Sequence, residues 1–410
     1  MKQFFIITAL AALTLTGCWN SQDLGDEANE YKPLELTTKG SEFVQKGEAF
    51  SFSFLEKIND AADKDYIISP LSMQFLLGMI LDGAQGETAE QIAAVLGYGA
   101  GETQQVDEYC LSMLTQLPKL DRRTGIAIAN AIYVDDGWPL KEAYKNEVAQ
   151  YYKAEISNLD FSDNEASLKE INGWCKKHTN GMIEKILDEV DPSNLCYLLN
   201  ALYFKGQWKE KFNKSVSAEE TFTNEAGVTS KVTMMKNEKE FPYAESKAFQ
   251  AVRLPYGNGA YAMTVILPKT GYTVKDVVTY LRDANWDEFR YGFDSREVKL
   301  WLPRFETKYN ILLNDILSEM GMPYAFDASN ANFSALSDYA LRLSFVQQHA
   351  AIKVDEEGTE AAAVSSAAFE KNAAMPLEPA VFHADHPFLY LITESSSGVV
   401  LFAGRYANAK

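Results

Sequence analysis

The sequence predicts one large α+β domain over residues 46–410, preceded by a separate N-terminal segment. No Pro/Gly/Ser-rich linker and no internal repeat interrupts residues 50–410, so nothing marks a second domain boundary. Hydrophobic residues make up 47% of the chain, which is enough for a sizeable core. Near the C-terminus, residues 356–368 have the composition of a strand with one face of small side chains.

The first residues are typical of an export signal. Lys2 precedes an apolar run over residues 4–15, which is too short to cross a membrane as a permanent helix. The run ends in Leu-Thr-Gly-Cys18, which resembles the lipidation box of bacterial lipoproteins. We therefore expect residues 1–17 to be a lipoprotein signal peptide and Cys18 to become the lipidated N-terminus; the alternative is an ordinary signal peptide with an incidental cysteine. Such a protein is exported and anchored to a bacterial cell envelope, at the outer membrane or the cell surface.

Residues 18–45 contain the lipidated cysteine and then a polar segment with more acidic than basic residues. Lys32 and Lys39 are outnumbered by the acidic residues Asp23, Asp26, Glu27, Glu30, Glu35 and Glu42. This composition predicts a flexible, solvated tether. The lipid chains would be the only contact with the membrane.

The formal net charge of the whole chain is −19 at pH 7. Binding to nucleic acid depends on clustered Lys and Arg that neutralise phosphates. The sequence therefore excludes nucleic acid as an expected partner.

The histidines and serines do not form a recognisable catalytic pattern. The chain has four histidines, His178, His349, His383 and His386, and no HExxH, Walker or GxSxG motif. His383 and His386 are close, but Pro387 and the apolar residues after it predict an extended segment, which favours packing over metal binding. We expect no enzyme activity, no metal and no cofactor.

Three cysteines remain after Cys18. Cys110, Cys175 and Cys196 are an odd number without CxxC spacing, so they predict no disulfide framework. We expect them to be small buried apolar residues, with a Cys175–Cys196 disulfide as the alternative.

The segment after Glu356 has alternating faces of different character. Side chains on a strand alternate between its two faces, and one face here carries only small residues: Thr359, Ala361, Ala363, Ser365 and Ala367. The charged Glu360 falls on the other face, and no proline blocks ladder hydrogen bonds. A strand with such a bare face can insert between two existing strands. The alternative is an exposed loop or short helix, because alanine is the best helix former.

Eight motifs in order resemble the serpin family from about residue 50 to the end. The most specific is the hinge sequence, which consists of Glu356, Glu357, Gly358, Thr359, Glu360, Ala361, Ala362 and Ala363. The other seven are Ser69-Pro70-Leu71-Ser72, Asn172-Gly173-Trp174 together with Thr179-Asn180-Gly181, residues 199–208, Leu302-Pro303-Arg304-Phe305, Met320-Gly321, Ala331-Asn332-Phe333-Ser334, and the final strand pair at residues 386–392 and 402–405.

This resemblance implies the α+β serpin fold, with about three β-sheets, eight to nine helices and an exposed reactive-centre loop at about residues 356–380. It also implies that Glu356 lies near Arg304 at the top of the main sheet, beside Trp208. We expect the protein to be a monomer.

The resemblance further implies a hydrogen-bonded latch beneath the main sheet, formed by Ser69, Ser72 and Asn200. The family usually has a histidine and then a lysine in the strand before the hinge, where this chain has Gln348 and His349. Gln348 can still donate and accept hydrogen bonds. We expect the latch to form without the pH sensitivity of an imidazole.

Serpins inhibit proteases by presenting a loop as bait. A serine or cysteine protease attacks a loop bond and forms an acyl-enzyme, and the cut loop then inserts into the main sheet and traps it. The small inserting face favours an inhibitor of this kind, with a non-inhibitory serpin acting as a surface-tethered binding module as the alternative. Residues 101–118, where some members bind glycosaminoglycans, have no basic stripe, so we expect no such cofactor.

The family spacing counted from Glu356 predicts cleavage after Asn372, and counting back from Phe382 and Pro387 predicts cleavage after Asn372 or Ala373. A shorter loop would expose Lys371 to trypsin-like enzymes, and Phe369 offers a chymotrypsin-like site. An elastase-like cut at residues 367–368 would leave less loop to insert. We favour cleavage at Lys371–Asn372 or Asn372–Ala373.

Overall fold

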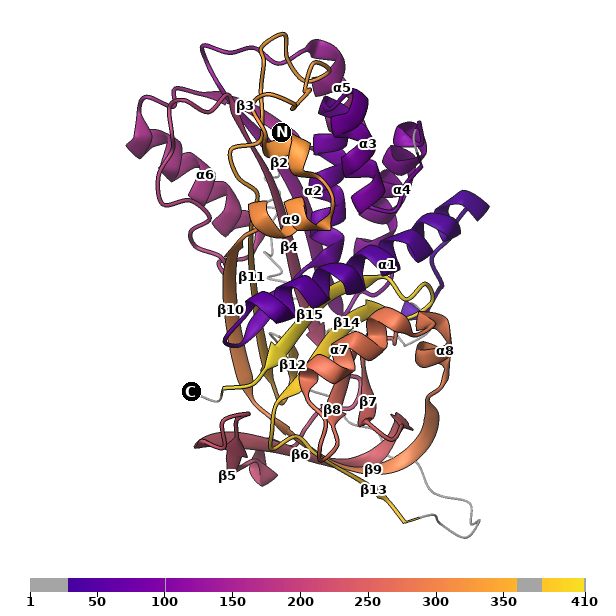
Figure 1. The fold of residues 1–410 in the computed structure, drawn as a ribbon. Coiled ribbons are helices and arrows are strands. Elements are labelled where there is room, and N and C mark those ends of the chain that lie inside the picture. Colours follow the sequence, from indigo (N-terminus) through magenta and orange to yellow (C-terminus); the bar gives the residue numbers. More distant parts are fainter. Residues whose placement is uncertain (1–28, 100, 360–377, 409–410) are drawn as a thin grey trace, which may run out of the picture.

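The computed structural model describes residues 29–99, 101–359 and 378–408. In these residues, nine α-helices surround two β-sheets (Figure 1). The helices are α1 Thr38–Ala61, α2 Pro70–Gly83, α3 Gly86–Val95, α4 Thr103–Gln116, α5 Glu142–Tyr151, α6 Asn164–His178, α7 Val274–Asp283, α8 Trp286–Tyr291 and α9 Asn314–Met320. The short 3-10 helices are Leu117–Lys119, Lys214–Val216 and Pro323–Phe326.

The first sheet has six strands in the order β10-β11-β12-β4-β2-β3. They are β10 Phe305–Leu312, β11 Gln347–Asp355, β12 Gly358–Thr359, β4 Cys196–Gln207, β2 Thr124–Asp135 and β3 Glu155–Leu159. The long strands β2 and β4 pair antiparallel, as do β10 and β11. Of the described residues, only the two-residue strand β12 lies between these two pairs (Figure 1).

The second sheet has nine strands, with the path β1-β15-β14-β8-β7-β6-β9-β13 and β5 paired to β6. They are β1 Tyr66–Ile68, β15 Val400–Tyr406, β14 Phe388–Glu394, β8 Tyr261–Pro268, β7 Phe249–Tyr256, β6 Thr229–Glu245, β9 Asp294–Pro303, β13 Ala380–His383 and β5 Ala218–Thr223. The predicted α+β class is confirmed. The hydrogen bonds connect the strands into two sheets rather than about three, because the 17-residue strand β6 pairs with β5, β7 and β9.

The two faces of the six-stranded sheet are covered by different helices. Ala201 and Leu199 of β4 pack with Trp174 and Ile171 of α6 on one face. Adjacent residues of a strand point to opposite faces, and Asn200 accordingly meets Ser72 of α2 on the other face. Helix α2 is almost wholly buried, so the sheet rests on a helix that belongs to the core.

The packed domain begins earlier than the sequence predicts. Helix α1 starts at Thr38 with Thr37 as its N-cap, inside the range assigned to the tether. Leu34 is buried, and the ring of Phe43 contacts Tyr98 and Tyr109 with centroids 4.9 and 5.8 Å apart. Residues 34–45 therefore belong to the folded domain, because their apolar side chains are buried against distant parts of the chain. The predicted signal peptide and Cys18 lie outside the described residues.

The remaining cysteines carry free thiols. Cys110 and Cys175 are buried and Cys196 is half-buried. Burial raises the pKa of Cys175 and of Cys196 to about 12, so both stay protonated near neutral pH. Within the described part of the chain, no helix combines the length and hydrophobicity that a membrane span needs.

Candidate functional site

The hinge residues Gly358 and Thr359 lie inside the six-stranded sheet as strand β12. Gly358 is opposite Asp355 of β11 and Gln207 of β4, and Thr359 is opposite Val354 and Gly206. Beyond these two residues, β11 and β4 do not pair with each other in the described part of the chain. The two strands therefore border a slot whose first positions are already filled by the hinge.

Gly358 occupies a position that only glycine fits. Its φ is +154°, and a Cβ atom there would lie 2.0 Å from the carbonyl oxygen of Gly206 and 2.8 Å from the Cα of Gln207. Side chains are rarely compatible with such backbone geometry. The glycine thus allows the hinge to pass directly beside β4.

Thr359 anchors the hinge to aromatic residues below the sheet. It is 1% exposed, and its Oγ1 lies 2.7 Å from the hydroxyl of Tyr256. The ring of Tyr256 stacks on Trp208 with centroids 4.5 Å apart. Trp208 also holds the backbone, because its Nε1 donates to the carbonyl of Asp355 and its amide donates to the carbonyl of Glu357, both at 2.9 Å. The start of the loop is therefore fixed by specific hydrogen bonds.

Glu356 is held by an ion pair at the top of the slot. Its Oε1 is 2.6 Å from Nη2 of Arg304 and accepts from the Ser217 hydroxyl at 2.8 Å. Burial would raise the pKa of Glu356, but the hydrogen bonds from Arg304 and Ser217 outweigh it and the pKa is lowered. The next residue, Glu357, pairs with Lys211 at 2.8 Å. The structure thus brings Glu356, Arg304 and Trp208 together at this end of the sheet.

The second predicted cluster joins helix α2 to the strands on both sides of the slot. Gln348 of β11 exchanges two hydrogen bonds with the backbone of Ser69, since its Nε2 donates to the carbonyl at 2.9 Å and its Oε1 accepts from the amide at 3.1 Å. The hydroxyl of Ser69 caps α2 by accepting from the Ser72 amide. The hydroxyl of Ser72 donates to Oδ1 of Asn200 on β4. These four residues form a continuous polar chain under the sheet.

Asn130 of β2 extends this chain and was missed in the sequence. Its Oδ1 accepts from Nδ2 of Asn200 at 2.6 Å, and its own Nδ2 donates to the carbonyl of Tyr152 at 2.6 Å. Asn130 is 1% exposed. One clue is present in the sequence: Asn130 is a lone amide within the mostly apolar strand 124–135. A buried amide needs hydrogen-bond partners, so its position predicts a polar contact beneath the sheet.

The remaining predicted site residues lie outside the described residues. They are Glu360, Ala361, Ala362 and Ala363 of the hinge and the reactive-bond candidates Phe369, Lys371, Asn372 and Ala373. The chain is described again from residue 378, and β13 pairs parallel with β9 of the second sheet. The two ends of the loop are therefore anchored in different sheets.

The histidines are placed as packing and surface residues. His383 contacts Glu220 at 3.0 Å, and His386 contacts Asp385 at 2.7 Å and the carbonyl of Pro268 at 2.9 Å. Burial lowers the pKa of His349 and of His178. Within the described ranges, no group of three or more His, Cys, Asp or Glu residues is arranged to hold a metal ion.

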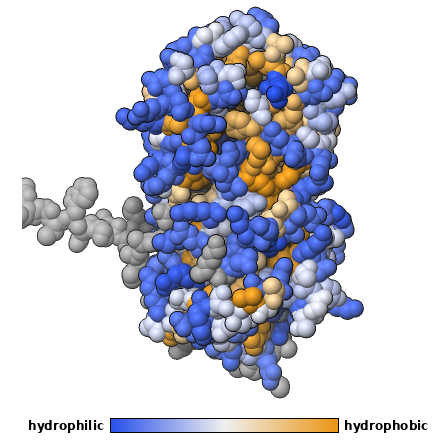
Figure 2. Space-filling view, turned by 60° about the vertical axis from the view of Figure 1, so that its left-hand side comes forward, coloured by the Kyte–Doolittle hydropathy of each residue, from blue (hydrophilic) through white to orange (hydrophobic). Residues whose placement is uncertain are grey.

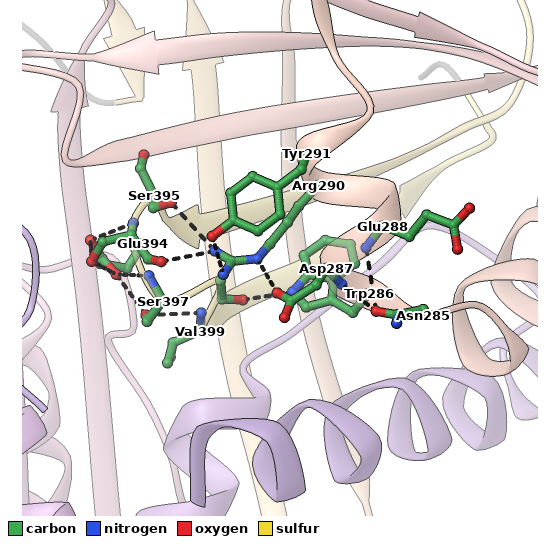
Figure 3. A network of polar contacts seen from close by, with 12 residues as sticks. Asn285, Trp286, Asp287, Glu288, Arg290, Tyr291, Glu394, Ser395, Ser397 and Val399 are labelled. Carbon is green, nitrogen blue, oxygen red and sulfur yellow. Dashed lines mark hydrogen bonds and ion pairs between the residues drawn. The ribbon is translucent and has the colours of Figure 1, made fainter. Parts of the chain in front are cut away.

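A second polar network lies away from the slot, where α8 meets the turn between β14 and β15 (Figure 3). The buried carboxylate of Glu394 accepts from the amide and hydroxyl groups of Ser396 and Ser397. Arg290 binds the Ser396 carbonyl at 3.0 Å, and Trp286 Nε1 donates to the Gly398 carbonyl at 3.1 Å. The adjacent cavity is only about 30 Å³. Because these donors and acceptors are hydrogen-bonded to one another, the network stabilises the turn.

Comparisons with known proteins agree with this geometry. The family described as Serpin (serine protease inhibitor) matches residues 45–409. An uncharacterized serpin-like protein of Thermococcus kodakarensis is 34% identical over 428 residues, covering 100% of both chains, and Serpin B6 of Bos taurus is 33% identical over 370 residues, covering 88% of this chain and 97% of its own. The solved native structure of tengpin, a thermophilic serpin, has a TM-score of 0.81 at 29% identity, covering 93% of this chain and 98% of its own.

The chain belongs to the serpin family. Members of this family are non-enzymatic protease inhibitors that generally bind target proteases. The position of the hinge between β11 and β4 is consistent with that class.

Proposed function

We propose that this protein is an inhibitory serpin that traps serine or cysteine endopeptidases as acyl-enzymes. The observation that carries the proposal is the position of Gly358 and Thr359 between β11 and β4, two strands that do not otherwise pair in the described residues. The hinge therefore lies at the entrance of the slot that a cleaved loop would fill.

The chemistry is supplied by the protease. Its Ser Oγ or Cys Sγ attacks the carbonyl carbon of the bait residue, and the peptide nitrogen leaves with a proton as a new amino terminus. The loop remains joined to the protease as an ester or thioester. Insertion of the loop into the slot then carries the protease along the sheet before water can release it.

The register of β12 supports insertion of the small face. Thr359 points to the buried side, where it meets Tyr256. In an inserted loop, continued alternation would put Ala361, Ala363, Ser365 and Ala367 on that same side. Each inserted residue gains ladder hydrogen bonds with a net value of about 1 kcal/mol each. The uncleaved form would then persist for kinetic reasons.

The experiment is incubation of the chain from residue 29 with trypsin, chymotrypsin, elastase and papain, followed by denaturing gels and mass spectrometry. We expect an SDS-stable adduct and a released C-terminal fragment that begins at Asn372 or Ala373. Cleavage without an adduct and without a gain in thermal stability would support a static binding module instead. Residues 29–45 are included because part of this segment packs on the domain.

We further propose that the protein is a lipoprotein anchored through Cys18 to a bacterial cell envelope, where it would protect envelope proteins from proteolysis. The proposal rests on the apolar run over residues 4–15 and the Leu-Thr-Gly-Cys18 sequence. Labelling of the full chain with radioactive palmitate in a bacterial host should depend on Cys18. Equal labelling of Cys18→Ser, or recovery of the unmodified chain in the culture medium, would contradict an anchor at this residue.

A further inference from the structure

The end of the slot farthest from the hinge contains a cavity of about 320 Å³. It lies where β4 and β11 begin, and its lining includes Leu76 and Ile80 of α2 on the core side and Ile186 and Leu187 after α6 on the other. The molecular surface turned toward the viewer in Figure 2 shows hydrophobic residues gathered in its upper half. Residues from both faces of the sheet thus border this cavity.

A hydrogen bond between two residues that line this cavity joins the segments leading into β11 and β4. The hydroxyl of Ser344, three residues before β11, donates to Oδ1 of Asn194, two residues before β4, at 2.7 Å. Both residues have a second hydrogen bond. Asn194 Nδ2 donates to the hydroxyl of Tyr197 on β4 at 2.9 Å, and Asn314 Nδ2 of α9 donates to the carbonyl of Ser344 at 3.0 Å. No peptide chain can pass between a donor and an acceptor at this distance.

The register of β12 shows which loop residues would reach this bond. Thr359 is opposite Gly206 and Val354, and in an inserted loop each later residue would lie opposite the preceding residue of both flanking strands. Residue 365 would then lie between Asn200 and Gln348. Counted further in the same register, residue 371 would reach Asn194 and residue 369 would reach Ser344. These loop positions immediately precede the proposed cleaved bond.

We propose that the Ser344–Asn194 hydrogen bond is a distal latch that must open for the last residues of the cleaved loop to insert. This inference rests on the proposed inhibitory function and names the positioning residues that govern its final step. Insertion as far as about residue 366 leaves the distal latch closed, and insertion to residue 371 opens it. The distal latch therefore acts on complete translocation and not on its beginning.

The test uses two synthetic peptides that copy residues 360–366 and residues 360–371, each labelled with a dye at its N-terminus. Their rates of incorporation into the intact protein are followed by fluorescence anisotropy and native gels. Ser344→Ala removes the donor, Ser344→Thr keeps a hydroxyl, and Asn194→Ala removes the acceptor. Ser193→Ala is the matched control, because the Ser193 hydroxyl donates to Asp191 at 2.7 Å on the same side of the slot and does not cross it.

We expect Ser344→Ala and Asn194→Ala to speed incorporation of the long peptide by about two- to tenfold, the rate effect of one net hydrogen bond. The short peptide should enter at the wild-type rate, and Ser344→Thr and Ser193→Ala should behave as wild type with both peptides. Equal acceleration of the two peptides, or no acceleration, would overturn the proposal. Failure of both peptides to enter any variant would overturn it too, because the slot would then not accept a strand.

This result is independent of the protease experiment. If no protease forms an SDS-stable adduct but the long peptide alone responds to Ser344→Ala, the inhibitory function fails and the distal latch stands. If adducts form but Ser344→Ala affects the rates of the two peptides equally, the inhibitory function stands and the distal latch fails.

Discussion

The side chain of Glu356 is 1% exposed, whereas that of Arg304, to which it is bound, is 45% exposed. The ion pair therefore connects a buried charge at the start of the loop to a cation at the protein surface. A buried carboxylate is costly without its partner. Arg304, together with the Ser217 hydroxyl, therefore holds the Glu356 carboxylate at this end of the sheet.

Arg304→Ala should destabilise the native state by about 1–3 kcal/mol, the cost of leaving a buried acceptor unpaired. Urea unfolding at pH 7 measures the change. Lys308→Ala is the control, because Lys308 is 66% exposed and pairs with the exposed Glu306, so its loss should cost under about 1 kcal/mol. Equal effects of the two substitutions would show that the Arg304 pair does not hold the hinge.

The same pair should make native stability depend on acid pH. Because the pKa of Glu356 is lowered in the folded protein, its contribution is present above the unfolded value of about 4.3 and is lost as pH falls through the folded pKa. The gap in stability between wild type and Arg304→Ala should therefore narrow below about pH 4. A gap that stays constant with pH would mean that Arg304 acts through packing.

Gly358→Ala should expel β12 from the sheet, because its Cβ would lie 2.0 Å from the Gly206 carbonyl. The amides of Trp208 and Phe212, which donate to the carbonyls of Glu357 and Glu356, should then exchange hydrogen at least about tenfold faster, equivalent to about 1.4 kcal/mol. Amides within β2 serve as the internal reference. Gly227→Ala is the matched control, since Gly227 also has a positive φ of +77° but no atom within 4 Å of the added Cβ. Unchanged exchange at Trp208 would show that the sheet tolerates the extra carbon.

Gln348→His should destabilise the protein, relative to the wild type, as the pH falls. Gln348 both donates to and accepts from the backbone of Ser69, and a neutral imidazole can do the same, whereas a protonated one cannot accept. The folded-state pKa of the new histidine would thus fall below about 6.5, and its contribution to stability would decrease as pH falls through that value. We expect the free energy of unfolding of the variant, relative to the wild type at the same pH, to drop by about 1 kcal/mol between pH 8 and pH 5 in urea unfolding.

The control for this substitution is Gln347→His at the neighbouring position. Gln347 is half-buried, and its Nε2 donates to Asn310 at 2.6 Å in an exposed hydrogen bond rather than to α2. A similar acid loss in both variants would assign the effect to added charge and not to the polar chain under the sheet.

The fold class and the pairing of Glu356 with Arg304 were accessible from the resemblance to the serpin family, because short motifs carry that resemblance, although the two residues are 52 positions apart. The role of Asn130 was not, because its partners Asn200 and Tyr152 lie 70 and 22 residues away. The early start of the domain was missed for a similar reason. Phe43 is buried only because Tyr98 and Tyr109 fold against it, and composition alone made that stretch resemble a solvated tether. Contacts between distant segments decide both features.

Asp82→Asn should stabilise the protein most at alkaline pH. Asp82 of α2 is packed against Asp107 of α4, which accepts from the Tyr152 hydroxyl at 2.8 Å, and Glu147 and Cys110 lie nearby. Burial raises the pKa of Asp82 strongly, and repulsion from Asp107 adds to this; burial also raises the pKa of Asp107. A raised folded-state pKa means that stability is fully present below the unfolded value of about 3.9 and is lost as pH rises toward the folded pKa. The thermal midpoint of the wild type should therefore decrease as the pH rises from about 5 to about 8.5, and the neutral amide of Asp82→Asn should remove most of that decrease.

Asp136→Asn, at an exposed position after β2, is the control and should leave the pH dependence of the thermal midpoint as it is in the wild type. If the thermal midpoint of Asp82→Asn depends on pH as strongly as that of the wild type, the Asp82–Asp107 pair is not the source of the alkaline destabilisation.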